Sequence, residues 1–241
     1  SEASDTQTFE LEVIKGPILR IQEVDVEVGS KSSKNLGNNA RIRRKAEPGD
    51  HLEFEVKIKN AYTREEDLDL EDVEVSITIV GIDDDDDLEE ESKTFDIRPG
   101  RTKTGKVDFD VPMITDEGSF DVIIKAEGDD ENGTLHEAEW TLELVVDKES
   151  HQVIINSASL FPTTVSCNRN SQLTAKLLNI GEDDEDVSVE VRSPDLGINI
   201  VTDENEISEN EDDIETIDLK IDDDIKPGTY PITINTISKG D

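Results

Sequence analysis

Apolar and polar residues alternate along most of this chain, in short runs that are separated by turn-forming residues. The segment "HLEFEVKIKN" at residues 51–60 is one example, with every second residue apolar. Strict period-two alternation predicts a half-buried antiparallel strand. The predicted inward residues of the first half are Leu52, Phe54, Val56 and Ile58; Val73, Val75, Ile77 and Ile79; Val107, Phe109 and Val111; Phe120, Val122 and Ile124; and Trp140, Leu142, Leu144 and Val146.

The connectors between these runs carry the residues that tight turns need. They read "EPGD", "RPGR", "DEGS" and "DDENG", which combine proline, glycine and side chains that bond to their own backbone. No stretch has the 3.6-residue period of an amphipathic helix. Many short strands at this spacing predict an all-β sandwich or barrel.

A second set of strands follows "VVDKESHQ" and echoes the first set. In both halves a strand ends at an asparagine (Asn60, Asn179), an acidic loop follows, and a valine-alternating strand resumes. "DEGSFDVIIKA" parallels "KPGTYPITINT" in the order glycine, hydroxyl residue, aromatic, strand. The echo predicts a duplicated domain, and the aromatic entry is typical of the penultimate strand of an immunoglobulin-like sandwich.

The chain has one predicted strand too many at its start and one too few at its end. The segment "TFELEVIKG" at residues 8–16 also alternates, with Phe9, Leu11 and Val13 on one face. The first domain needs no further strand there. The second domain finishes on the strand of Tyr230, Ile232 and Ile234, with no closing strand after it. One interpretation is that the extra strand extends the first domain's own sheet. A second is donor-strand complementation, in which it completes the second domain of a neighbouring subunit. Packing against the chain's own second domain is a third.

Composition narrows the possible partners. The 241 residues carry a formal net charge of −37, with 33% hydrophobic and 35% charged residues. This charge excludes electrostatic attraction to nucleic acids and anionic lipid surfaces. No apolar run approaches the ~20 residues of a membrane span. The single cysteine, Cys167, allows no intramolecular disulfide.

The residues that begin and end the predicted strands resemble those of a known family. "PGD" before a strand that ends in asparagine, "RPGRTKTGKVDFDV", and "GTYPI" before the last strand are similar to CARDB-like and related immunoglobulin-fold repeats of archaeal surface and S-layer-type proteins. The resemblance covers roughly residues 40–237, and it departs from the pattern at Ala61-Tyr62, where a small residue and glycine are usual, and at the missing last strand. It implies an extracellular, non-enzymatic module that is secreted with removal of a signal peptide; the start without methionine fits a mature form or a trimmed chain.

The sequence contains few candidate residues for metal binding, modification or catalysis. The acidic hairpin "EGDDENG" offers Asp129, Asp130 and Asn132 as the best local calcium cluster, because calcium prefers several hard oxygen ligands. A solvated acidic loop is the simpler interpretation. Asn132-Gly133-Thr134 is also a glycosylation sequon. His51, His136 and His151 show no metal-ligand spacing, and no nucleophile–base motif is present, so no enzyme and no cofactor other than calcium is predicted.

These observations predict an all-β chain of two tandem immunoglobulin-like β-sandwich domains with an extra N-terminal strand. The expected boundaries are 1–16 for the possible donor strand, 17–148 for domain 1 and 152–241 for domain 2. The predicted function is that of a structural protein of the archaeal cell surface, a filament or surface-layer subunit that assembles head-to-tail with copies of itself by strand addition. The alternative is the stalk, or a calcium-dependent adhesive or carbohydrate-binding module, of a larger surface protein.

Overall fold

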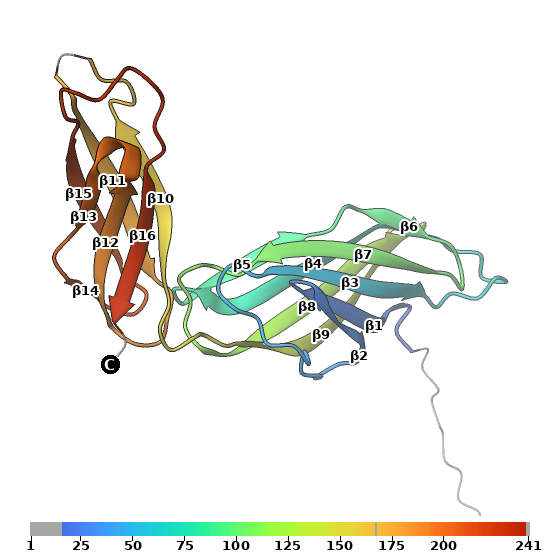
Figure 1. Ribbon diagram of the computed structural model, residues 1–241. Helices are drawn as coiled ribbons and strands as arrows, with labels where there is room; N and C mark the ends of the chain where they lie inside the picture. Colours follow the sequence, from blue (N-terminus) through green and yellow to red (C-terminus); the bar gives the residue numbers. More distant parts are fainter. Residues whose placement is uncertain (1–15, 167, 240–241) are drawn as a thin grey trace, which may run out of the picture.

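The computed structural model describes residues 16–166 and 168–239, and nearly all regular structure in this part of the chain is β-strand (Figure 1). The one exception is a 3₁₀ turn, η1 (Pro194–Leu196). The prediction of an all-β fold is therefore confirmed. Among the described residues, no helix has the length and apolarity that crossing a membrane requires.

The strands of residues 16–148, which we call the N-terminal module, form two antiparallel sheets. One sheet has the order β2-β1-β3-β7, and the other has the order β5-β4-β8-β9 with β6 also paired to β4. The strands are β1 (Leu19–Val28), β2 (Lys31–Leu36), β3 (His51–Asn60), β4 (Leu70–Asp83), β5 (Asp86–Glu91), β6 (Phe95–Ile97), β7 (Thr102–Asp110), β8 (Gly118–Asp130) and β9 (Leu135–Val146).

Alternation in the sequence explains which face of each strand is buried. On β3, Leu52, Phe54, Val56 and Ile58 are fully buried, while the residues between them reach solvent. The same holds for the alternating apolar residues of β4. These side chains meet in one hydrophobic core between the two sheets, because burial of apolar surface on both facing sheets is the main favourable term in folding.

Residues 149–239, the C-terminal module, repeat this plan with fewer strands. One sheet has the order β10-β11-β15; the other has the order β13-β12-β14, with β16 also paired to β12. The strands are β10 (Val153–Phe161), β11 (Asn170–Asn179), β12 (Glu185–Ser193), β13 (Ile198–Val201), β14 (Asn205–Ile207), β15 (Asp212–Lys220) and β16 (Thr233–Lys239). A second, separate core cluster fills the space between these sheets.

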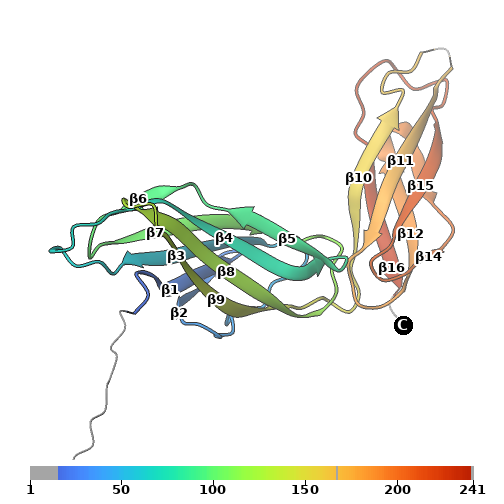
Figure 2. The same ribbon diagram turned by 180° about the vertical axis from the view of Figure 1, so that it is seen from behind.

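The modules are elongated and meet at an angle, as the two opposite views show (Figures 1 and 2). Their junction is polar. The side chain of Lys148 is fully buried there, and its Nζ donates to Glu209 Oε1 at 2.7 Å and to Asn210 Oδ1 at 2.9 Å. Asn210 in turn donates to Asp116 Oδ1 of the N-terminal module at 2.9 Å. This chain of bonds ties the linker and both modules together.

One predicted strand begins later than its alternation suggests. Tyr230 and Ile232 precede β16, which starts at Thr233. Pro231 between them has no N–H to donate to a ladder, and the Tyr230 hydroxyl donates instead to the carbonyl of Lys226 at 2.7 Å. The strand that was expected to start near Tyr230 is therefore shorter at its N-terminal end.

Candidate strand-acceptor site

The outer edge of β16 has no strand partner in the described part of the chain. Within residues 16–166 and 168–239, β16 pairs with β12 alone, in a register that matches Val191 with Ile234 and Val189 with Thr236. In the opposite sheet, β10 is also an edge strand. The two edges lie near each other without forming a ladder, so no strand pairing closes this side of the C-terminal module; we call this unpaired side between β10 and β16 the gap.

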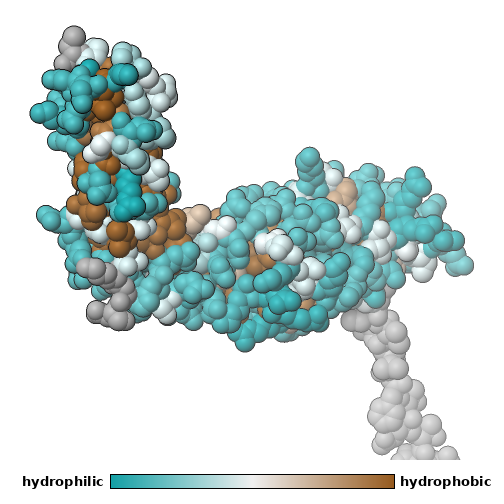
Figure 3. All heavy atoms as spheres, viewed as in Figure 1, coloured by the Kyte–Doolittle hydropathy of each residue, from teal (hydrophilic) through white to brown (hydrophobic). Residues whose placement is uncertain are grey.

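The predicted acceptor residues lie along this gap. Tyr230, Ile232 and Ile234 pack against the second core cluster, and each remains partly exposed. The inner face of β10 contributes three further apolar residues that pack against this core and remain partly exposed: Val153, Ile155 and Leu160. Figure 3 shows apolar residues gathered on the C-terminal module, whereas the visible face of the N-terminal module is mainly hydrophilic. The structure therefore brings the predicted acceptor residues to an apolar, incompletely covered surface.

A cavity of about 890 Å³ lies at the end of the C-terminal module that is remote from the junction. The segments before β11 and between β15 and β16 form its walls (Figure 1, top of the module). Its apolar lining includes Leu160, Val165, Leu196, Leu219, Ile225 and Ile232. The cavity shares Leu160 and Ile232 with the gap.

Three polar side chains of this cavity bond to backbone carbonyls of the same module. Arg169 donates to the carbonyls of Asp222 and Ile225, Ser171 donates to the carbonyl of Pro162, and Tyr230 donates to that of Lys226.

The N-terminal module closes the equivalent position. There β8 pairs with β4 on one side and with β9 on the other. The outer edge of β9 is covered in turn by residues 38–46, which bond to it at Thr141, Glu143 and Val145. This segment could not be predicted from the sequence, because "NNARIRRKA" has no alternating apolar pattern.

The predicted donor residues Phe9, Leu11 and Val13 lie outside the described residues. The structure does show where the described chain begins, next to β1. β1 begins at Leu19, which pairs with Asn60. That end of the N-terminal module lies opposite the end where Val146 leads into the linker (Figure 1). The residues that precede Gly16 therefore join the chain at the free end of the N-terminal module, remote from the C-terminal module.

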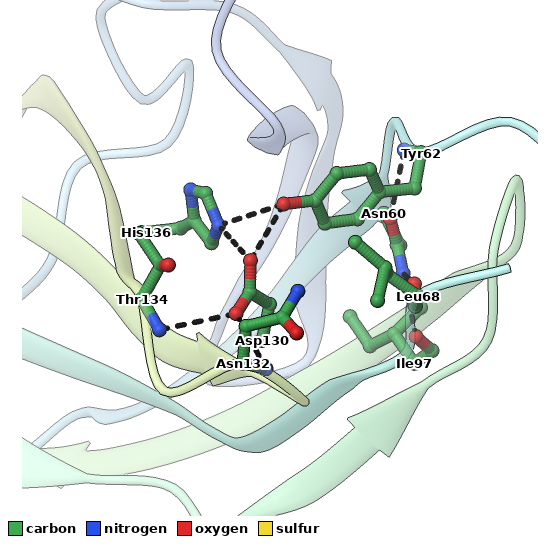
Figure 4. A network of polar contacts seen from close by, with 8 residues as sticks. All are labelled: Asn60, Tyr62, Leu68, Ile97, Asp130, Asn132, Thr134 and His136. Carbon is green, nitrogen blue, oxygen red and sulfur yellow. Dashed lines mark hydrogen bonds and ion pairs between the residues drawn. The ribbon is translucent and has the colours of Figure 1, made fainter. Parts of the chain in front are cut away.

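A buried polar cluster occupies this same free end (Figure 4). The Tyr62 hydroxyl donates to Asp130 Oδ2 at 2.7 Å, and His136 Nε2 lies 3.2 Å from the same oxygen. The backbone N–H groups of Asn132 and Thr134 donate to Asp130 Oδ1. The bond from Tyr62, then that from Thr134, holds the pKa of the Asp130 carboxyl well below its usual range. The same bond to Asp130 raises the pKa of Tyr62 to about 12.

This cluster bears on the predicted calcium ligands. Both carboxylate oxygens of Asp130 are engaged by protein donors, Asp129 lies in the β8–β9 ladder, and Asn132 is exposed at the hairpin turn. No grouping of three or more histidine, cysteine or acidic side chains that could hold a metal ion occurs among the described residues. Calcium binding here stays a prediction, as does glycosylation of the exposed Asn132.

The remaining candidate residues have structural neighbours. His51 Nδ1 pairs with Asp110 at the surface, and His151 Nδ1 lies 2.6 Å from Glu185 Oε1, a carboxylate that is fully buried at the start of β12. Trp140 is partly buried against the first core. Cys167 lies outside the described residues. The roles of His136 and Glu185 were missed because their partners lie far away in the sequence or in the linker.

Comparisons with known proteins do not identify a family for this chain. No family model matches the sequence, and no curated protein matches it. Among solved structures, the chain is similar to the C-terminal domain of Wzt, with 12% identity over 56% of this chain and 76% of that one and a TM-score of 0.39. It is also similar to CBD12 from CALX1.2, with 15% identity over 76% of this chain and 73% of that one and a TM-score of 0.27. These values are too low to support an argument about fold family or function.

Proposed function

We propose that this chain is a non-enzymatic structural protein made of two tandem immunoglobulin-like β-sandwiches, and that it assembles head-to-tail by β-strand addition. The observation that carries the proposal is the unpaired outer edge of β16 beside a gap lined by partly exposed apolar residues. Such an edge promotes association with another strand unless something covers it. Strand addition gives affinity through backbone hydrogen bonds and specificity through alternate side chains.

The partner in this proposal is another copy of the chain. The donor is the segment of Phe9, Leu11 and Val13, and the acceptor is the groove beside Tyr230, Ile232 and Ile234. Because donor and acceptor surfaces differ and lie at opposite ends of the molecule, the contact is heterologous and generates an open row instead of a closed ring. The resemblance to archaeal surface repeats supports a place in a filament or layer outside the cell.

The polar bonds at the junction support a mechanical role for the pair of modules. Lys148, Glu209, Asn210 and Asp116 link the two modules through buried or directly bonded side chains. Bonds of this kind restrict the angle between modules, whereas a linker without contacts would leave them free to move. A stiff pair of modules would serve equally in a filament and in the stalk of a larger surface protein.

Deletion of the donor tests the proposal. The full chain and a version lacking residues 1–15 should be compared by size-exclusion chromatography and negative-stain microscopy. We expect fibres or a ladder of oligomers from the full chain and monomers from the shortened chain, with a synthetic "TFELEVIKG" peptide binding to the latter. A matched peptide with Leu11→Asp should not bind. If both proteins are equally monomeric and neither peptide binds, assembly by strand addition is rejected.

A further inference from the structure

The closing strand of the N-terminal module provides an internal template for the donor. On β9, Trp140, Leu142 and Leu144 are the inward residues, opposite Ile124, Val122 and Phe120 of β8. The stretch "WTLELV" at residues 140–145 has the order aromatic, polar, leucine, glutamate, aliphatic, aliphatic. The stretch "FELEVI" at residues 9–14 has the same order. The donor segment therefore has the sequence pattern of a closing strand.

The duplicated plan identifies the partner of each donor residue. Gly118 and Gly228 each stand two residues before an aromatic residue, so Phe120, Val122 and Ile124 correspond to Tyr230, Ile232 and Ile234. The ladders agree with this alignment, since Ile124 pairs with Ile77 of β4 and Ile234 pairs with Val191 of β12.

We infer that the segment Thr8–Lys15 of a second copy closes the C-terminal module antiparallel to β16, with Phe9 opposite Ile234, Leu11 opposite Ile232 and Val13 opposite Tyr230. This inference rests on the proposed function and adds to it the orientation and register of the added strand. Side chains that lie directly opposite each other are the unit of specificity between strands. A slip by one residue would turn every apolar donor side chain outward.

The change from apolar to polar residues supports this register over one shifted by two. Ile232, just before β16, and Ile234 on β16 are followed on the same face by Thr236 and Ser238. Along the same face of the donor, read in the opposite direction, Leu11 and Phe9 are followed by Gln7 and Asp5. The change falls at the same point in both strands only when Phe9 faces Ile234.

Charge is compatible with this pairing. The chain contains 61 Asp and Glu residues among 241, yet β10 and β16, the strands that flank the gap, contain none. In contrast, β9 carries Glu137, Glu139 and Glu143. The donor brings Glu10 and Glu12. Like charges directly opposite each other destabilise a sheet, so two acid-free edges suit an acidic strand.

The position of the junction supports the antiparallel orientation. β16 ends near the junction, since Lys239 pairs with Asp186 at the start of β12. An antiparallel donor runs towards the remote end of the acceptor, where its own N-terminal module finds open space. A parallel donor would carry that module towards the junction, where the acceptor's own N-terminal module already lies (Figure 2).

Cysteine pairing between copies tests the register. In a Cys167→Ser background, the inferred pairing places Glu10 opposite Thr233 and Thr8 opposite Asn235, all on the outward face. Single-cysteine proteins carrying Glu10→Cys, Thr8→Cys, Thr233→Cys and Asn235→Cys are mixed in pairs and oxidised. We expect intermolecular disulfides in the matched mixtures (10 with 233, 8 with 235). The crossed mixtures (10 with 235, 8 with 233) should stay at the level of the cysteine-free parent.

Each other outcome has a defined meaning. Cross-linking in the crossed mixtures, or between Glu12→Cys and Thr233→Cys as a parallel strand would give, overturns the inferred register or orientation and leaves strand addition intact. Assembly by size exclusion without cross-linking in any mixture overturns the inference, because the contact then avoids the β16 edge. Absence of assembly in the cysteine-free parent rejects the proposed function itself.

Discussion

The two modules share one plan but differ in how their penultimate strand is covered. In the N-terminal module, β8 lies between β4 and β9, and its inward residues Val122, Ile124 and Ala126 are fully buried. In the C-terminal module, β16 lacks a partner on its outer side among the described residues, and Ile232 and Ile234 remain partly exposed. The difference shows how much of a sandwich core depends on one closing strand, even when both facing sheets are otherwise present.

The shared part of the plan is equally informative. Asn60 and Asn179 are both fully buried at the end of the second long strand of their module. Each amide donates to two backbone carbonyls and accepts one backbone N–H, two residues further on. One of these carbonyls, that of Ile97 or Ile207, belongs to the opposite sheet. The asparagine therefore fastens the two sheets to each other.

The largest expected effect comes from truncating equivalent core residues. Ile124→Ala removes a fully buried side chain and should destabilise the N-terminal module by about 2–5 kcal/mol. Ile234→Ala should cost less than about 2 kcal/mol, since its side chain already reaches solvent and less apolar area returns to water. Urea denaturation followed by Trp140 fluorescence reports the first module, and amide hydrogen exchange reports the second.

A ligand for the groove should remove this asymmetry. When the "TFELEVIKG" peptide is bound, the cost of Ile234→Ala should rise towards that of Ile124→Ala, because the added strand buries the side chain. Equal costs in the two modules without any peptide would contradict the interpretation that β16 has an open edge.

The next effect concerns the feature that the modules have in common. Asn60→Ala and Asn179→Ala each leave one buried carbonyl, one part-buried carbonyl and one N–H without their side-chain partner, and each should cost roughly 2–4 kcal/mol. The Asp variants are the matched controls, since a carboxylate keeps the acceptor but loses both donors. Thermal unfolding of the four variants measures the costs. If either alanine variant unfolds like the natural protein, the amide does not fasten the sheets.

Sequence reasoning succeeded where one strand supplies its own pattern. The inward residues of β3, β4 and β11 follow directly from alternation, and the asparagine positions emerged from comparing the halves. It failed where structure depends on distant partners. Residues 38–46 lie along β9 by backbone hydrogen bonds, which leave no signature in side-chain polarity. The sequence did not reveal the role of His136, because Tyr62, which shares Asp130 with it, is remote in the sequence.

A smaller effect should distinguish the modules by their response to pH. The pKa of Asp130 is lowered, so its contribution is present above about pH 4, near its unfolded pKa, and is lost as pH falls. The pKa of Tyr62 is raised to about 12. Its contribution is therefore present below about pH 10 and is lost as pH rises towards that value. The C-terminal module has Gly181 at the position of Tyr62 and lacks this cluster.

Tyr62→Phe separates the two arms of this response. The variant should lose the alkaline dependence entirely and keep part of the acid dependence, because Asn132 and Thr134 still donate to Asp130. Urea midpoints followed by Trp140 fluorescence across the pH range give the comparison. An alkaline dependence that persists in the variant would show that another group is responsible.

The smallest effect lies at the junction, where the two modules meet through acidic side chains. Glu117 of the N-terminal module shares a hydrogen bond with Glu182 of the C-terminal module, which raises the pKa of Glu182; Asp183 and Asp147 add to the shift. A raised pKa means that the folded contact binds the proton more tightly, so it stabilises the junction at acid pH and is lost as pH rises. At neutral pH the two ionised carboxylates repel each other, weakly because solvent and salt screen them.

Glu117→Gln should therefore make the angle between the modules independent of pH, because an amide can donate to the Glu182 carboxylate in its ionised state. Small-angle scattering or residual dipolar couplings at low salt, between pH 4 and pH 7, would detect the change in the natural protein and its absence in the variant. Asn210→Ala is a useful control, since it removes the bond to Asp116 and should loosen the junction at every pH. If the natural protein keeps one angle over this range, the bonds of Lys148 and Asn210 outweigh the repulsion between the two carboxylates. The angle between the modules is then fixed.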